Sequence, residues 1–330
     1  MNPSTVCVIG DGSWATAIMR MLLQNGIHAG WFVRNPKRRE HILKYKRNPD
    51  YLSSVELNTE SINFYADLNQ AIKNSGKLIF VIPSVYLKDT LSSLKQDLHD
   101  KIVVSAIKGI IPGDNILIAD YFQIYHKVDP YRYAVISGPC HAEEVAMEKL
   151  SYLTITSRQP RVAREVAALL NSWYIKTSIS QDVYGTEYAV ALKNIMAIAA
   201  GICHALNYGD NFQAVLVSNA IREMNRFLRR VDPQVGDIMG SSYLGDLLVT
   251  AYSQFSRNRT FGTMIAKGYS VKSAKLEMNM VAEGYHAVKC IHELNQKFLV
   301  NMPITDAVYN ILYEKISPGI EIHLLTEHLS

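Results

Sequence analysis

The sequence has few cysteines and no arrangement of them that would build a disulfide framework or a metal site. Its four cysteines, Cys7, Cys140, Cys203 and Cys290, are widely separated, with no CxxC motif and no paired cysteine–histidine spacing. This pattern disfavours a disulfide scaffold and a structural zinc site, and it fits a reducing compartment. We expect a protein that holds no metal.

Long apolar runs, a leader-like N-terminus and a strong charge of one sign are also missing. Residues 1–4 carry no basic group, and the longest apolar stretch, residues 188–206, is interrupted by Lys193 and His204. An integral membrane span is therefore not expected, and the sequence predicts a cytoplasmic protein. The 34 basic and 30 acidic residues leave a net charge of +4, too weak for nucleic-acid binding but suited to small anions.

The 330 residues are enough for two domains at about 150 residues each. In the first half, short apolar runs alternate with segments of helical periodicity. Near-continuous apolar runs such as 77–82 and 101–106 are typical of parallel strands covered by helices on both faces. The other runs that we expect to form strands are 5–9, 29–33, 133–137, 152–156 and 174–178. This alternation predicts a Rossmann-like, doubly wound α/β sheet.

The second half changes to helical periodicity and contains few alternating β-branched runs. The segments expected to be helices are 183–206, 212–230, 243–255, 270–278, 282–296 and 303–315. We therefore predict a dinucleotide-binding domain over residues 1–182 and an all-α domain, which carries substrate binding and catalysis, over residues 183–330.

A glycine-rich turn follows the first expected strand and opens the first expected helix. It reads Gly10-Asp11-Gly12-Ser13-Trp14-Ala15, the pattern G-x-G-x-x-A. The first glycine allows a tight turn, the second lets a pyrophosphate approach the backbone, and the small last residue lets helix and strand pack closely. A dinucleotide site is the favoured interpretation, and a glycine-rich turn without a ligand is the alternative. Asp11 is unusual here because a carboxylate could repel the pyrophosphate.

The end of the second expected strand bears on which cofactor is used. An acidic residue at this position binds the ribose 2′-hydroxyl of NAD, but the sequence has Arg34, followed by Lys37, Arg38 and Arg39. An arginine can accommodate the 2′-phosphate of NADP. The sequence therefore favours NADP over NAD, although a solvated basic helix face would give the same residues.

Several segments together resemble the glycerol-3-phosphate dehydrogenases that use nicotinamide cofactors. Besides the glycine-rich turn, the segments that carry the resemblance are Ser105-Ala106-Ile107-Lys108-Gly109, Ser137 to Ala146 (SGPCHAEEVA), Glu187 to Gly201 (EYAVALKNIMAIAAG), Gly209-Asp210-Asn211, Gly245-Asp246-Leu247, Ser256 to Gly262 and Val281-Ala282-Glu283-Gly284. Their order along the chain makes the resemblance specific. It implies interconversion of glycerone phosphate and sn-glycerol 3-phosphate, supply of glycerol 3-phosphate for phospholipid synthesis, and a homodimer.

The resemblance also implies roles for individual residues. Lys193 would be the proton acceptor, paired with Asp246. The residues implied to bind substrate are Lys108, Gly138, Cys140, Lys193, Asp246, Ser256, Arg257 and Asn258. The residues implied to bind the cofactor are Gly10, Gly12, Ser13, Trp14, Arg34, Lys108, Ala142, Arg257, Val281 and Glu283. Cys140 departs from the family, which usually has a hydroxyl there, and a thiol is a weaker donor.

The residues themselves support parts of this assignment. Lys193 lies in an apolar segment, so it is either buried for a chemical purpose or a surface lysine whose ammonium reaches solvent. We favour burial, which lowers the pKa of a lysine toward the range of a useful base. Asp246 either orients Lys193 or is an ordinary first-turn acid of a helix. Arg257 and Asn258, expected in a polar turn after a helix, could hold a phosphate. Ala197, Ala200 and Gly201 leave room for a ligand or for a closely packed helix.

Two other functions remain open from the sequence. A related two-domain dehydrogenase of the ketopantoate-reductase kind would use Arg257 and Asn258 to bind a carboxylate. A non-catalytic NADPH sensor would keep the glycine-rich turn but would not need Lys193 and Asp246 as a pair.

Overall fold

The computed structural model describes residues 4–232, 235–278 and 282–330, and it contains two compact units. One unit consists of Met1–Ile107 with Ile118–Val183, and the other of Lys108–Leu117 with Tyr184–Ser330. We call them the sheet unit and the helical unit. The segment 108–117 therefore groups with the helical unit, a discontinuity that the expected division after residue 182 does not contain.

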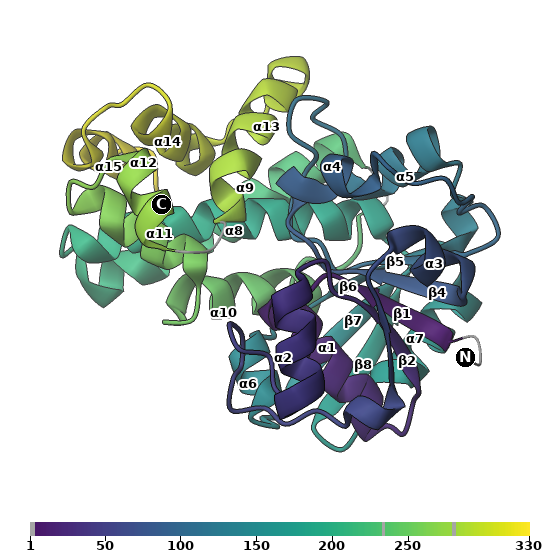
Figure 1. The fold of residues 1–330 in the computed structure, drawn as a ribbon. Coiled ribbons are helices and arrows are strands. Elements are labelled where there is room, and N and C mark those ends of the chain that lie inside the picture. The colour runs from purple at the N-terminus through teal and green to yellow at the C-terminus, as the bar shows by residue number, and fades with distance from the viewer. Residues whose placement is uncertain (1–3, 233–234, 279–281) are drawn as a thin grey trace. The chain divides into compact units, whose positions relative to one another are not determined.

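The sheet unit is built on one eight-stranded sheet with the order β3-β2-β1-β4-β5-β6-β7-β8. The strands are β1 Ser4–Ile9, β2 Ala29–Phe32, β3 Ile62–Tyr65, β4 Ser75–Phe80, β5 Ile102–Ser105, β6 Tyr133–Ser137, β7 Ser151–Thr156 and β8 Ile175–Ser180. All neighbours pair in parallel except β6 and β7 (Figure 1). The strand order reverses beside β1, where open α/β sheets bind ligands at the carboxyl ends of the strands.

Helices cover both faces of this sheet. They are α1 Ser13–Gln24, α2 Pro36–Tyr45, α3 Leu68–Lys73, α4 Leu87–Leu91, α5 Ile118–His126, α6 Ala142–Ala146 and α7 Pro160–Leu170. Side chains alternate between the two faces along a strand. Val6 and Val8 of β1 accordingly join the apolar core with α1 and α7, whereas Phe80 of β4 packs on Phe122 of α5, with ring centroids 4.8 Å apart.

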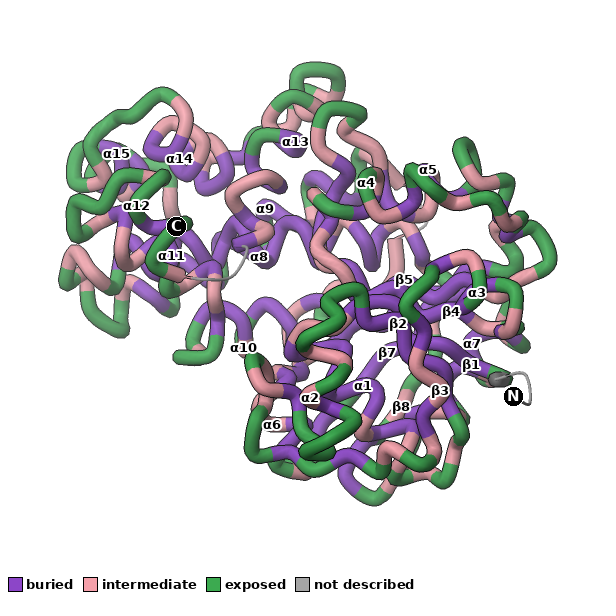
Figure 2. Tube along the Cα trace, viewed as in Figure 1, coloured by how far each residue is buried: buried purple, intermediate pink, exposed green. Residues whose placement is uncertain are grey.

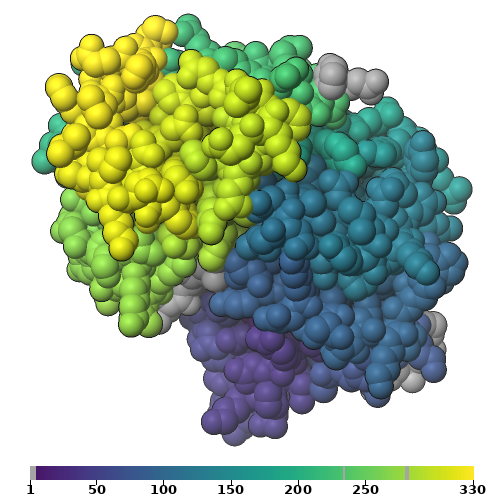
Figure 3. Space-filling view, turned by 90° about the horizontal axis from the view of Figure 1, so that it is seen from above, coloured from purple at the N-terminus to yellow at the C-terminus, as the bar shows by residue number. Residues whose placement is uncertain are grey.

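The helical unit is arranged around α8 (Val183–Ala205). The other helices are α9 Gly209–Val231, α10 Asp246–Tyr252, α11 Arg257–Ala266, α12 Val271–Glu277, α13 Glu283–Phe298, α14 Pro303–Leu312 and α15 Pro318–Thr326, with a π-helical turn at Ser241–Gly245 before α10. The α8 helix is buried over most of its length (Figure 2). Helix α14 packs against both α13 and α15, and the C-terminal residues form one continuous yellow region of the surface (Figure 3). The predicted α/β sheet followed by an all-α region is confirmed.

Helix α8 is long and apolar enough to cross a membrane by length and composition. Of its most apolar window, however, 83% is buried inside the structure. This burial is what the central helix of a packed helical unit requires, because such a helix is apolar on all sides.

Candidate active site

The glycine-rich turn bends sharply at Gly10 and leads directly into helix α1. Gly10 has φ +128°, and a Cβ there would lie 2.3 Å from the carbonyl oxygen of Val81, so only glycine fits. Gly12 is the N-cap of α1, and a Cβ there would meet nothing within 4 Å. The space beside Gly12 is therefore open, at the end of α1 where a helix N-terminus can bind an anion. Ser13 and Trp14 form the first turn.

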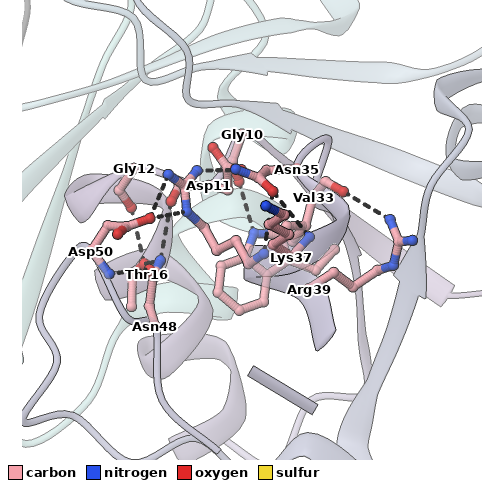
Figure 4. Close-up of polar contacts among 12 residues, drawn as sticks. Gly10, Asp11, Gly12, Thr16, Val33, Asn35, Lys37, Arg39, Asn48 and Asp50 are labelled. Atoms are coloured by element: carbon pink, nitrogen blue, oxygen red, sulfur yellow. Dashed lines mark hydrogen bonds and ion pairs between the residues drawn. The ribbon is translucent and has the colours of Figure 1, made fainter. Parts of the chain in front are cut away.

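The structure explains how Asp11 is accommodated. Its carboxylate Oδ2 lies 2.6 Å from Nη1 of Arg38 on α2. Figure 4 shows Asp11 in the turn with Gly10 and Gly12, and Asn48 beside it. Arg38 also pairs with Asp50 at 2.7 Å. The buried Asn48 donates a hydrogen bond to the Asp11 carbonyl oxygen at 3.1 Å and to Thr16 Oγ1 at 2.8 Å. The carboxylate is thus neutralised by Arg38 on the neighbouring helix α2, a pairing that could not be predicted from the sequence.

The basic residues after β2 divide into two kinds. Arg39 donates to the carbonyl oxygen of Val33 at 3.2 Å, and Arg38 is held by the two carboxylates. Arg34 and Lys37 are exposed. The Asn35 side chain caps α2 by accepting from the backbone N–H groups of Lys37 and Arg38. Arg34 is therefore the arginine that the protein leaves exposed directly after β2.

Another motif with a glycine, which includes Gly138, follows β6. Gly138 has φ +113°, and a Cβ there would lie 2.6 Å from the carbonyl oxygen of Tyr152, so the backbone turns sharply where β6 ends. The buried Cys140 thiol donates to the Gly138 carbonyl oxygen at 3.4 Å. The thiol at position 140 therefore bonds to the backbone of its own turn. Ala142 begins α6 and is buried.

Lys193 and Asp246 form a buried ion pair in the helical unit. The Lys193 Nζ atom lies 2.5 Å from Asp246 Oδ1, and both side chains are 3% exposed. The predicted burial of Lys193 is confirmed. Asp246 is also the first residue of α10, so it is both a first-turn acid and the partner of Lys193. Among the described residues its Oδ2 atom is buried without a hydrogen-bond partner, which leaves one acceptor for a bound molecule.

Arg257 and Asn258 lie in the first turn of a helix, so their expected position in a turn after a helix is wrong. Ser256 is the N-cap of α11, and its Oγ accepts from the Arg259 backbone N–H at 3.3 Å. Asn258 Oδ1 accepts from the Gly284 backbone N–H at 2.9 Å. Because this bond occupies the amide oxygen, the amide nitrogen of Asn258 remains as a donor.

Two close helix contacts fix this turn against α8. A Cβ on Gly262 would lie 2.1 Å from the Ile198 carbonyl oxygen, and a Cβ on Gly201 would lie 2.0 Å from the Arg259 carbonyl oxygen. Thr263 Oγ1 donates to the Gly201 carbonyl oxygen at 3.1 Å. The α8 and α11 backbones therefore touch, which sequence reasoning raised only as one of two options for Gly201.

Asn194 on α8 contacts two other candidate segments, at Lys108 and at Gly284. Its side-chain amide donates to the Lys108 carbonyl oxygen at 3.0 Å, and a Cβ on Gly284 would lie 2.6 Å from its carbonyl oxygen. Glu283, partly buried, is the first residue of α13. Sequence reasoning missed Asn194, although it directly follows Lys193. Val281, also expected at the cofactor, lies outside the described residues.

Comparison with known proteins gives a consistent family. A model of the N-terminal part of NAD-dependent glycerol-3-phosphate dehydrogenase matches residues 5–163, and the model of the C-terminal part matches residues 182–323. A glycerol-3-phosphate dehydrogenase (NAD(P)+) of Exiguobacterium sp. is 36% identical over 326 residues, covering 98% of this chain and 95% of the relative. One of Carboxydothermus hydrogenoformans is 35% identical over 321 residues, covering 96% and 95%.

Solved structures agree with these relatives. The crystal structure of glycerol-3-phosphate dehydrogenase from Coxiella burnetii matches with a TM-score of 0.91 and 26% sequence identity, and the match covers 98% of this chain and 99% of that one. The fold and the sequence therefore point to the same family over nearly the whole chain.

Proposed function

The chain belongs to the NAD-dependent glycerol-3-phosphate dehydrogenase family, and from that premise we propose that it interconverts glycerone phosphate and sn-glycerol 3-phosphate. The observation that carries the proposal is the buried Lys193–Asp246 pair, with one carboxylate oxygen left for a bound molecule. Removing two charges from water costs free energy that their attraction only partly returns, so a buried ion pair is weak evidence for a purely stabilising role.

The nicotinamide of NAD or NADP supplies the hydride acceptor or donor when it is bound. The glycine-rich turn holds the pyrophosphate through Gly10, Gly12 and the first N–H groups of α1. Arg34 binds the ribose 2′-phosphate, so NADP is preferred. The further residues that we assign to the cofactor are Ser13, Trp14, Lys108, Ala142, Arg257 and Glu283.

Lys193 moves the proton. In the reducing direction its ammonium donates a proton to the carbonyl oxygen of glycerone phosphate, and in the oxidising direction the neutral amine removes the hydroxyl proton. Asp246 Oδ1 orients the amine, and Oδ2 accepts a hydrogen bond from a substrate hydroxyl. The Arg257 guanidinium and the Asn258 amide nitrogen hold the substrate phosphate, and Lys108, Gly138, Cys140 and Ser256 complete the substrate site.

The proposal also covers the roles of the two domains, the location, the oligomeric state and the metabolic role of the protein. We infer a dinucleotide-binding domain over residues 1–182 and a catalytic, substrate-binding domain over residues 183–330, a cytoplasmic homodimer, and supply of glycerol 3-phosphate for phospholipid synthesis.

A spectrophotometric assay with glycerone phosphate and each reduced cofactor in turn tests the function. Lys193→Ala is expected to lower kcat by at least about a thousandfold, because general acid–base catalysis contributes up to about 10⁴ and the variant also leaves Asp246 buried without its partner. Cofactor affinity should stay within a few-fold, and the exposed Lys297→Ala is the matched control.

Three results would contradict the proposal. Full activity of Lys193→Ala would remove this lysine from the mechanism. Turnover of ketopantoate but not of glycerone phosphate would favour the carboxylate-reducing alternative. Tight NADPH binding without turnover of any phosphorylated triose would favour a sensor.

A further inference from the structure

Arg38 connects three segments around the glycine-rich turn. Its Nη1 atom pairs with Asp11 in the turn at 2.6 Å, and its Nη2 and Nε atoms contact Asp50 Oδ2 at 2.7 and 2.8 Å. The side chain is only 15% exposed. Two carboxylates, one of them inside the turn, therefore occupy this guanidinium.

Residues 48–50, which include Asp50, are held to the glycine-rich turn at a second point. Asn48, which is fully buried, donates to the Asp11 carbonyl oxygen and to Thr16 Oγ1, and its own Oδ1 accepts from the Asp50 backbone N–H at 3.2 Å. Thr16 Oγ1 in turn donates to the Gly12 carbonyl oxygen at 3.0 Å. The conformation of the turn is thus determined by residues 48–50 as well as by its own glycines.

The charge of Asp11 makes this connection relevant to binding. A pyrophosphate bound at the first N–H groups of α1 carries negative charge, and Asp11 lies between the two glycines that admit it. An unpaired carboxylate there repels the ligand, and the repulsion is large because the side chain is partly shielded from water, at 22% exposure.

We propose that Arg38 is a positioning residue for cofactor binding: it neutralises Asp11 and holds the glycine-rich turn in the shape that receives the pyrophosphate. This inference rests on the proposed function, because it requires that the turn binds NAD(P). Both edges of the guanidinium are engaged with carboxylates, so Arg38 does not read the ribose 2′-phosphate. That task falls to Arg34.

The two roles predict different patterns of loss. The pyrophosphate is common to NADH and NADPH, so loss of Arg38 weakens both cofactors by the same factor. A residue that reads the 2′-phosphate affects NADPH alone. The ratio of the two dissociation constants therefore separates a positioning residue from a specificity residue.

The experiment measures dissociation constants of NADH and NADPH, without substrate, by titration calorimetry. Arg38→Gln is expected to weaken both cofactors about tenfold, since the unpaired Asp11 charge would then lie within the turn that receives the pyrophosphate. Asp11→Asn should bind at least as tightly as the wild type. In the double variant Asp11→Asn/Arg38→Gln, both dissociation constants should lie within about threefold of those of Asp11→Asn, because the carboxylate charge that Arg38 neutralises is gone.

Two further variants keep the test decisive. Arg38→Lys retains the charge but not the planar fork that spans both carboxylates, so it should bind both cofactors more tightly than Arg38→Gln and more weakly than the wild type. Lys44→Gln, an exposed charge near the end of the same helix, should change neither constant. At saturating cofactor, kcat of Arg38→Gln should remain within about twofold of the wild type, since the reacting groups are untouched.

Several outcomes overturn the inference. A loss confined to NADPH would make Arg38 a reader of the 2′-phosphate. Equal weakness of Arg38→Gln and the double variant would leave only a structural role, and if Arg38→Gln does not fold, weaker binding by Asp11→Asn would refute the electrostatic argument. Failure of the wild type to bind either cofactor would refute the proposed function itself, whereas wild-type binding with an unaffected Arg38→Gln refutes only this inference.

Discussion

At Gly262, the addition of a single methyl group should lower both the stability and the turnover of the protein. In Gly262→Ala the new Cβ would lie 2.1 Å from the Ile198 carbonyl oxygen and 3.0 Å from its carbonyl carbon. Ordinary contact begins near 3.4 Å, so the methyl group is about 1.3 Å too close. Both partners are backbone atoms of packed helices, and no side-chain rotation relieves the overlap. The α8 and α11 backbones must therefore separate or bend.

The size of the effect follows from this overlap. Overpacking costs about 1–3 kcal/mol, and contact with rigid backbone places Gly262→Ala near about 3 kcal/mol. For a unit of this size, that corresponds to a fall in Tm of roughly 6–12 °C. Arg257 and Asn258 lie one turn earlier on α11, so a shift of about 1 Å at the contact also moves them, and misplacement by that distance can lower turnover about a hundredfold.

Scanning calorimetry and the steady-state assay measure the two effects. Gly319→Ala is the matched control, because Gly319 lies in helix α15 and a Cβ there would meet only Ser317 Oγ at 4.0 Å. That variant should be as stable as the wild type or slightly more so, since alanine is the better helix former. Wild-type Tm and activity in Gly262→Ala would refute the reasoning, because they would mean that the two backbones do not touch.

Two other predictions concern charge. Burial raises the pKa of Glu223 from 4.5 to about 7, so between these values the folded state holds the proton more tightly than the unfolded state and stability falls as pH rises from 5 to 8, by at most about 3 kcal/mol. In thermal melts of Glu223→Gln, stability should no longer fall between pH 5 and 8. If it falls as in the wild type, other groups cause the pH dependence. Arg34→Asp should weaken NADPH at least about tenfold and NADH much less. An unchanged ratio of the two constants would show that Arg34 does not read the ribose.

The sequence predicted the strands that are buried on both faces, because such strands are near-continuous apolar runs. It missed β3 (Ile62–Tyr65), whose middle residues, Asn63 and Phe64, are only partly buried and interrupt the apolar pattern. It also gave no indication that β7 runs antiparallel to β6, since strand direction depends on the path of the connection and not on local composition.

Helix α11 escaped prediction for a different reason. Its first residues are Arg257, Asn258 and Arg259, a polar run that resembles a loop. Ser256 is a good N-cap, but no glutamate or glutamine follows three residues later to complete a capping box, so the start was not marked. The chemistry of Arg257 and Asn258 was visible in the sequence, whereas their position on a helix was not.

The same distinction applies to the small residues of α8. Sequence reasoning left open whether Ala197, Ala200 and Gly201 admit a ligand or a neighbouring helix, because both require the same absence of side chains. The structure resolves this for Gly201: its neighbour is the Arg259 backbone, and Gly262 makes the reciprocal contact with Ile198.

These two contacts determine more than packing. Lys193 precedes Gly201 by eight residues, about 12 Å along α8, and Asn258 precedes Gly262 by four residues, about 6 Å along α11. A crossing that is fixed at backbone contact therefore sets the distance between the proposed base and the proposed phosphate ligands within the helical unit. Larger residues at the crossing would change that distance, so the glycines act as positioning residues although neither carries a functional side chain.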